Sequence, residues 1–440
     1  MPKTLNMTSG SISRQLIGYA LPLILGNIFQ LTYNVVDAAI VGRFIGKDVL
    51  AAVGTASPVM NLFILGISGV CIGASVIMSR AFGADDFQKL RREMATLSVF
   101  GLYFSAIITL PGIIFAGQIM TALQVPNSIY DVSVLYLRLI FIGMPFTYFY
   151  NAISSALKSV GDSKTPLKFL VFASVLNAGL DIVLIGFFGF GVVCSAMTTV
   201  VAQAVSAVLC IIYVYRKVPV LHIEAHGFKA DRALLKETLK YGGVTALQQA
   251  CQPIGKLLIQ GCVNTMGVDV MAAFNAATRV DDYACTPEQN ISHAMTTFTA
   301  QNYGANKPER IRRGFRVGML IELVYGVVIF GLVFLCRTPI MHIFVSADAV
   351  EVIRLGSDYL ALMSFLYILP GFTNGFQGYF RGMGHMPITL AGTITQITIR
   401  TACVYALSQS YGINAIPAAC ATGWCVMLVL QVVYYFKMKK

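Results

Sequence analysis

Polar residues recur at helical spacing within long apolar stretches of this chain. Gln30, Tyr33, Asn34 and Asp37 fall at i, i+3, i+4 and i+7, so a helix presents all four on one face. Three further sets have this kind of spacing, namely Tyr148, Asn151 and Ser155, then Asn177 and Asp181, then Ser195, Thr199 and Gln203. Because burying such groups in hydrocarbon is costly, they normally face a bundle interior or a water-filled cavity.

Two of these residues are carboxylates that can bind an ion together. Asp37 and Asp181 each lie a few residues from the outer end of an apolar stretch, so they reach a similar depth. Two close carboxylates away from water cannot both stay ionised at low cost, and one proton or Na⁺ between them relieves the repulsion. Asn177, Thr199 and Tyr136 can add oxygen ligands. The alternative is that Asp37 reaches the outer interface and Asp181 only hydrogen-bonds a neighbouring helix.

The apolar stretches that carry these residues identify the class of protein. Hydrophobic residues make up 56% of the chain and charged residues 12%, with a mean hydropathy of +0.71, whereas a soluble domain has roughly 25% charged residues. Most stretches are near the ~20 residues that cross a membrane as a helix. Twelve are present, at about 15–40, 50–78, 92–117, 128–156, 165–187, 191–215, 234–263, 269–299, 314–336, 352–379, 387–407 and 413–436. The sequence predicts an all-α integral membrane protein with twelve transmembrane helices.

Basic residues predict the topology of these helices. Most of the 32 lysines and arginines fall at the two termini and in the loops after even-numbered helices, whereas the other loops carry only Arg43, Lys47, Arg337 and Arg354. By the positive-inside rule both termini then lie in the cytoplasm. The net charge of +12 is therefore mainly a topology signal, and no nucleic-acid partner is expected.

An internal repeat divides the chain. A shift of 221 positions superposes GKDVLAA at 46–52 on GVDVMAA at 267–273, and FGADDFQKLRR at 82–92 on YGANKPERIRR at 303–313. Each half has an even number of helices, so two parallel six-helix lobes related by a pseudo-twofold axis along the membrane normal are predicted. The predicted boundaries are an N-lobe at 1–215, a cytoplasmic linker at 216–232 and a C-lobe at 233–440.

The second half carries charges of both signs. The eighth predicted helix holds Arg279, Asp281, Asp282 and Glu288. A structural interpretation, which we favour, pairs Lys256 of the seventh helix with Glu288 or Asp282 as a buried salt bridge. A functional interpretation makes Glu288 or Asp282 a second ion site or a site for cationic substrates. Glu322 is alone on the ninth helix, where it is either paired or protonated.

Several segments resemble the multidrug and toxic compound extrusion (MATE) family. They are LPLILGNIFQLTYNVVDAAIVGRFIGKDVLAAVG, the GDSKTP loop at 161–166, LNAGLD at 176–181, and the repeated (F/Y)GA turn before a basic cluster. Within that family the acidic pair resembles the DinF-like branch. The resemblance implies cation-driven drug export by two lobes that open alternately to the two sides, and it assigns Asp37, Asn177, Asp181 and Thr199 to ion binding, with Tyr136 nearby.

The same resemblance makes Pro22 the bend of the first helix. Pro22 removes the backbone hydrogen bond to residue 18, which is a glycine, so a kink there is cheap. Whether that kink moves or is static stays open. The polar residues assigned to a substrate cavity are Gln30, Tyr33, Asn34, Asn151, Gln203, Gln252, Lys256, Asp282 and Glu288.

The predicted function is that of a secondary active multidrug antiporter. It would export amphipathic or cationic organic compounds in exchange for H⁺ or Na⁺, as a monomer in a bacterial inner membrane, with no cofactor and no enzymatic activity. Metal binding would be limited to Na⁺ at Asp37 and Asp181, because the ten cysteines show neither CxxC nor a His/Cys metal spacing. The alternative is a flippase of lipids or lipid-linked oligosaccharides from the same superfamily.

Overall fold

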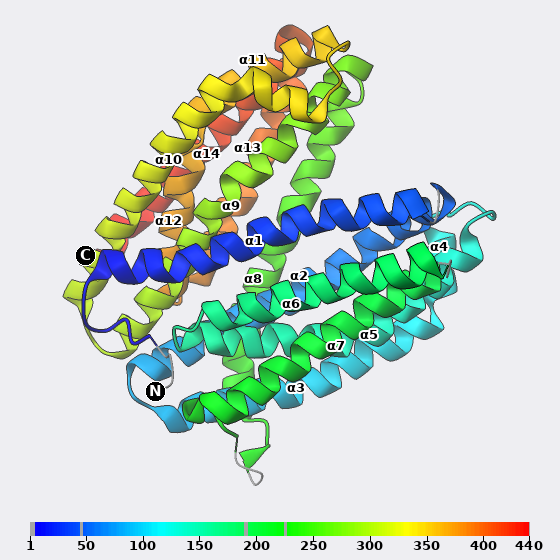
Figure 1. Ribbon diagram of the computed structural model, residues 1–440. Coiled ribbons are helices and arrows are strands. Elements are labelled where there is room, and N and C mark those ends of the chain that lie inside the picture. Colours follow the sequence, from blue (N-terminus) through cyan, green and yellow to red (C-terminus); the bar gives the residue numbers. More distant parts are fainter. Residues whose placement is uncertain (1–4, 45–46, 189–191, 224–226, 440) are drawn as a thin grey trace. The chain divides into compact units, whose positions relative to one another are not determined.

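The computed structural model describes residues 5–44, 47–188, 192–223 and 227–439, without the side chains of residues 34–44, 47–52, 186, 192 and 439. The described residues form helices joined by short turns, and no strand occurs among them (Figure 1). The helices up to the middle of the chain are α1 (Ile12–Phe44), α2 (Lys47–Gly83), α3 (Phe87–Ile114), α4 (Ala116–Ala122), α5 (Tyr130–Ser159), α6 (Lys164–Asp181), η1 (Ile182–Phe187), α7 (Val192–Lys217) and η2 (Pro219–Leu221). Those that follow are α8 (Arg232–Val263), α9 (Val268–Gly304), α10 (Pro308–Phe344), α11 (Val350–Leu366), α12 (Ile368–Gly382), α13 (Met386–Tyr411), η4 (Gly412–Asn414) and α14 (Ala415–Lys439).

The long helices correspond to the twelve predicted ones when α11 and α12 are taken together. In the described part of the chain, eight helical segments are long and apolar enough to cross a membrane, or nine with the α11–α12 pair, which bends by 44°. α13 and α14 count there as a single segment, and α8 and α9 fall short. α8 carries Lys256, and α9 carries Arg279, Asp281, Asp282 and Glu288. The low hydropathy of these two helices therefore indicates that they need protein or water around them and not lipid alone.

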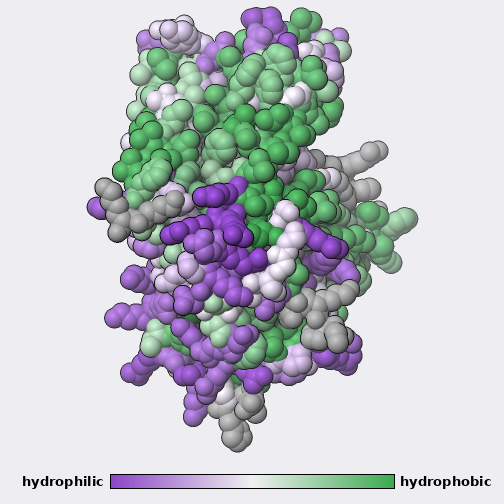
Figure 2. Space-filling view, turned by 90° about the vertical axis from the view of Figure 1, so that its left-hand side faces the viewer, coloured by the Kyte–Doolittle hydropathy of each residue, from purple (hydrophilic) through white to green (hydrophobic). Residues whose placement is uncertain are grey.

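Hydrophobic side chains cover much of the surface, as lipid contact requires. Figure 2 shows them over continuous areas of the visible face. Large apolar side chains stand out from the helices, among them Leu335 at 78% exposed, Ile343 at 75% and Leu257 at 71%. In a soluble protein such a surface would aggregate, so the pattern agrees with a multi-pass membrane protein.

Two compact units make up the fold, and each takes in part of the other half of the sequence. The first unit comprises residues 1–6 and 25–246, and the second 7–24 and 247–440. The predicted boundaries at 215 and 233 follow the sequence instead. The difference arises because α1 changes unit after Ile24 and α8 changes unit after Ala246, two positions that the internal repeat makes nearly equivalent.

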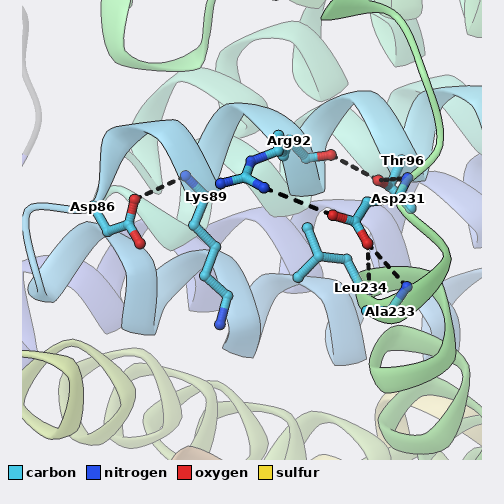
Figure 3. A network of polar contacts seen from close by, with 7 residues as sticks. All are labelled: Asp86, Lys89, Arg92, Thr96, Asp231, Ala233 and Leu234. Carbon is cyan, nitrogen blue, oxygen red and sulfur yellow. Dashed lines mark hydrogen bonds and ion pairs between the residues drawn. The ribbon is translucent and has the colours of Figure 1, made fainter.

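Hydrogen bonds attach the start of α8 to α3 in the first unit (Figure 3). The backbone amide of Asp231 donates to the Thr96 hydroxyl at 3.0 Å. The Asp231 carboxylate accepts from the amides of Ala233 and Leu234 at 2.9 and 3.2 Å, which caps α8. Arg92 lies 3.9 Å from the same carboxylate. The cap thus defines the start of α8, and the contacts with Thr96 and Arg92 hold this end of the helix against α3.

Farther along α8, small residues and a buried acid continue this attachment. A Cβ added at Gly73 of α2 would overlap the backbone of Gly242, so glycine is required for the two helices to approach this closely. Glu93 of α3 is fully buried, and the Thr238 hydroxyl donates to it at 2.5 Å. A buried polar group without such a donor would cost about 1–3 kcal/mol, so the contact favours this packing of α8.

The N-terminal segment is held in the second unit by Arg310 of α10. The guanidinium group donates to the carbonyl oxygens of Met7, Ser9 and Gly10 at 3.0, 3.1 and 2.9 Å and to the Gln15 side chain at 2.7 Å. Arg310 belongs to the repeated basic cluster, which in this copy lies at the start of α10. In this copy the basic cluster therefore fastens the chain terminus, in addition to setting topology.

The repeated turn before α3 and α10 has the same backbone form in both copies. Asp85 has φ 56° and Asn306 has φ 53°, and the shift of 221 relates these two positions. Asp and Asn tolerate this left-handed conformation better than most residues. In the first copy Asp86 then accepts from the Lys89 amide at 2.9 Å (Figure 3) and caps α3.

Candidate ion-coupling and substrate sites

Asp181 is a buried acid of the first unit. It is the last residue of α6, is fully buried, and precedes the π-helical segment η1. The Thr198 hydroxyl of α7 donates to its Oδ1 at 2.5 Å. Single turns of π-helix are rare and frequent at functional sites. The carboxylate is thus buried at a local irregularity and supported by a neighbouring helix.

Asn177 lies one turn before Asp181 with an unsatisfied amide. Its side chain is 2% exposed, and neither its Oδ1 nor its Nδ2 hydrogen-bonds to any described group. An unsatisfied buried amide is costly, so such a group in a native structure calls for an explanation. Its carbonyl oxygen, beside a carboxylate, has the chemistry of a ligand for a small cation.

Thr199 and Tyr136 are the other residues predicted near the ion, and their ligand role stays a prediction. Thr199 is half-buried, and its hydroxyl donates at 2.9 Å to the carbonyl oxygen of Ser195 on its own helix. Tyr136 is 8% exposed on α5. The adjacent Thr198, which the sequence stripe through Thr199 did not single out, donates its hydroxyl to Asp181.

Asp37 and Asn34 lie outside the described residues as far as their side chains are concerned. The predicted pairing of Asp37 with Asp181 stays a prediction. Of the same stripe, the Gln30 side chain is exposed and Tyr33 half-buried. Pro22 lies within α1, whose helix continues through it.

A small pocket lies between α2, α5 and α7 of the first unit. Its lining residues are Met60, Ile64, Ile140, Gly143, Met144, Thr147, Thr199, Val200 and Gln203. Thr147 donates a hydrogen bond to Gln203, and Asn151 donates to the Thr147 carbonyl oxygen at 2.8 Å. Thr147 therefore links the predicted cavity residues Asn151 of α5 and Gln203 of α7 by hydrogen bonds. Met60 and Met144 line the same pocket, and methionine side chains repack easily.

In the second unit Lys256 forms a salt bridge with one of its two predicted partners, but this salt bridge is exposed and not buried. Lys256 pairs with Asp282 at 2.5 Å, but the two side chains are 60% and 47% exposed. Glu288 takes no part in the pair and is fully buried. Lys256 lies on the exposed face of α8, so it cannot compensate the charge of an acid buried against α10 and α12.

Asp281 and the glutamines show where the polar interior of this unit lies. Tyr359 and Tyr367 donate to the two oxygens of Asp281 at 2.8 and 2.6 Å. Gln248 of α8 is 5% exposed and donates to Gln377 at 3.0 Å, whereas Gln252, the predicted cavity residue, is exposed. The inward face of α8 therefore includes Gln248.

The same family model matches both halves of the chain. The family is described as MatE, and the matches cover residues 22–183 and 245–406. The chain belongs to the MatE family. Its members are transporters, so the MatE protein is a multi-pass membrane transport protein and no enzyme.

Two relatives and one solved structure illustrate the similarity of this MatE chain to known proteins. The "Probable multidrug resistance protein YoeA" of Bacillus subtilis is 27% identical over 82% of this chain and 79% of its own. The "FAD transporter" of Shewanella oneidensis is 23% identical over 87% of this chain and 86% of its own. A solved structure titled "Crystal structure of MATE in complex with MaL6" superposes with a TM-score of 0.92 at 21% identity, covering 100% of this chain and 98% of that one. That likeness confirms the all-α fold in two lobes.

Sequence reasoning on this MatE protein found Asp181 and Asn177 but missed their surroundings. Thr198 is one residue from the predicted stripe, and only the actual rotation of α7 selects it. The neighbour of Glu288 was missed as well, because Glu322 lies on another helix with no spacing that relates the two.

Proposed function

We propose that the chain is a secondary active multidrug exporter that exchanges amphipathic or cationic organic compounds for H⁺ or Na⁺ by alternating access. The observation that carries the proposal is Asp181. It is a fully buried carboxylate that accepts a hydrogen bond from Thr198, beside the Asn177 amide, which has no hydrogen bond among the described residues, in a chain whose two halves match one transporter family. A group of this kind is expensive to maintain without a function.

The proposed ion site combines Asp181 with Asp37 from α1, and Asn177, Thr199 and Tyr136 complete it. Ion binding neutralises the acidic pair, and ion release restores its charge. If substrate favours one conformation with the pair empty, and the ion favours the other, each ligand shifts the population by its differential affinity. Reversing a 1:99 equilibrium takes about 5.5 kcal/mol.

The side chains around the small pocket of the first unit support the proposal of a broad substrate range. Met60 and Met144 line it beside the polar Thr147 and Gln203. Methionine side chains repack around different shapes, and the name of the Bacillus subtilis relative agrees with a multidrug substrate range. The relative named as an FAD transporter makes a flavin nucleotide a substrate worth including in the same assay.

The proposed setting is the bacterial inner membrane, with a monomeric protein whose two termini are cytoplasmic. The support is the concentration of lysine and arginine at the termini and in the loops after even-numbered helices. A C-terminal fluorescent fusion tests this part, because the reporter folds in the cytoplasm and stays dark if the terminus is exported.

The experiment that tests transport is efflux from proteoliposomes under an imposed pH or Na⁺ gradient, with ethidium as the probe. Asp37→Asn and Asp181→Asn should each abolish gradient-driven movement, since both remove the charge that binds the ion. The matched control is Asp269→Asn, at the start of α9 in the second unit, because Asp269 is not one of the proposed ion ligands.

Three outcomes of this efflux assay would contradict parts of the proposal. Gradient-driven transport by the wild type that persists in folded Asp37→Asn and Asp181→Asn proteins contradicts the proposed ion site. Movement of ethidium or FAD that ignores both gradients contradicts antiport itself, and current without substrate exchange indicates a channel.

A further inference from the structure

Two carboxyl side chains lie buried beside one another in the second unit. Glu288 of α9 is fully buried and Glu322 of α10 is 1% exposed, and α9, α10 and α12 pack against one another. A Cβ added at Gly371 of α12 would have Glu322 Oε2 at 3.5 Å and the carboxyl carbon of Glu288 at 3.7 Å among its three nearest heavy atoms. Both carboxyl groups therefore border one small space that Gly371 leaves open.

Neither carboxyl group accepts a hydrogen bond from the described residues. All four oxygens of Glu288 and Glu322 are buried without a hydrogen bond in the part of the chain that the structure describes. The hydroxyl of Tyr325 on α10, which interacts electrostatically with both residues, donates to the Ala284 carbonyl oxygen at 2.8 Å. Structural buried acids normally have donors, as Asp281 has from its two tyrosines.

No basic side chain among the described residues compensates the pair. The titratable groups that interact electrostatically with the pair are Cys285 of α9 and Tyr325 of α10. Cys285 in turn interacts with Asp281 and Asp282 of α9, with Lys256 of α8 and with Tyr367, which follows α11. Lys256 is engaged with Asp282 on the exposed face of α8. Two adjacent carboxylates in such surroundings cannot both be ionised, because burial and mutual repulsion each oppose the charge.

We propose that Glu288 and Glu322 form a second ion-coupling site, which holds one monovalent cation, H⁺ or Na⁺, and releases it during the transport cycle. The proposal rests on the proposed function, since a cation that never leaves would only stabilise the fold. Pro287 interrupts the backbone hydrogen bonding of α9 directly before Glu288, and α12 starts at the 44° bend. Both breaks place the pair where helices can change shape.

The first test counts ions per substrate. In proteoliposomes, the imposed ion gradient is balanced against a substrate gradient until net flux stops. Glu288→Gln and Glu322→Gln should each lose one coupled ion, so a tenfold ion gradient sustains roughly tenfold less substrate accumulation. Glu309→Gln, an exposed acid at the start of α10, is the control and should match the wild type.

The second test observes the carboxyl groups directly and does not depend on transport. Infrared difference spectra between ion-loaded and ion-free protein should show a carboxyl signal that Glu288→Gln and Glu322→Gln remove and Asp181→Asn retains. This readout stands even if the first-unit site proves wrong, so failure of the proposed function and failure of this inference are distinguishable.

Gly371→Ala separates the two ions. The added methyl group would meet both carboxyls at ordinary contact distance, so the protein should fold while the space for Na⁺ is filled and a shared proton is still accommodated. Loss of the signal with Na⁺ identifies Na⁺, and its retention identifies H⁺. An unchanged ion count in folded Glu288→Gln, or a carboxyl signal that never responds to ion loading in the wild type, overturns the proposal.

Discussion

The two units place their buried acids at positions that the other unit fills with apolar or small residues. The shift of 221 relates Glu288 to Ile67 and Glu322 to Gly101. Ile67 is 1% exposed and belongs to the hydrophobic core of the first unit. A Cβ at Gly101 would overlap the ring of Tyr148, which fills the corresponding space.

The opposite relation holds for Asp181 of the first unit. Asp181 corresponds to Ala402, and its donor Thr198 corresponds to Ala419, which is fully buried in the core of the second unit. One scaffold thus carries a different buried acidic site in each copy. Duplication supplies the helices, and substitutions at facing positions supply the chemistry, so substitutions at related positions should have different consequences in the two units.

The largest difference is expected at the related positions Gly101 and Glu322. Gly101→Val should destabilise the protein by about 3 kcal/mol, because overpacking a filled core has a cost of this order and Tyr148 is anchored by its hydrogen bond to the Leu97 carbonyl oxygen at 2.9 Å. Glu322→Gln should leave stability unchanged or raise it, since an unpaired buried acid is removed. The apparent Tm in detergent checks both. Equal losses in the two variants would break the comparison.

The next effect concerns the segments that cross between units. Arg310→Ala removes every bond from that side chain to residues 7–15, so amide hydrogen exchange there should accelerate by tenfold or more, since about 1.4 kcal/mol corresponds to tenfold. Arg312→Ala is the control, because Arg312 is 56% exposed and pairs only with Glu309 among the described residues. Unchanged exchange in Arg310→Ala would show that burial of α1, and not Arg310, holds the segment.

Much of this architecture follows from the sequence, because its signals are local or repetitive. Apolar length predicts the helices, and the repeat predicts the matching turns at Asp85 and Asn306. The passage of α1 and of α8 from one unit to the other was not predictable, since it depends on contacts between distant residues such as Glu93 and Thr238. For the same reason, spacing within one helix found Asp181 and Asn177 but not the pairing of Glu288 with Glu322 across two helices.

Thr198 and Thr199 sharpen the comparison within the first unit. Thr198→Val removes the donor to Asp181, and hydrogen bonds to charged groups are worth about 1.5–3 kcal/mol. The empty carboxylate is then less stable, so ion release and gradient-driven efflux should slow by roughly tenfold. Thr199→Val removes a hydroxyl that donates within its own helix, and its effect should be smaller. A larger effect at Thr199 would restore the ligand role that the sequence assigned to it.

The smallest effect is expected at the exposed pair of the second unit. Lys256 and Asp282 are both about half exposed despite their short separation, and ion pairs in that situation contribute about 0–1 kcal/mol. Lys256→Met, Asp282→Asn and the double variant should therefore differ little in apparent Tm, with a coupling energy below about 1 kcal/mol. Glu288→Gln, at a later position of α9, should change the number of ions coupled to each substrate molecule and leave the apparent Tm unchanged. If Asp282→Asn alters the ion count as much as Glu288→Gln does, the exposed pair and the buried pair act as one site, and the charged cluster of the second unit is functional throughout.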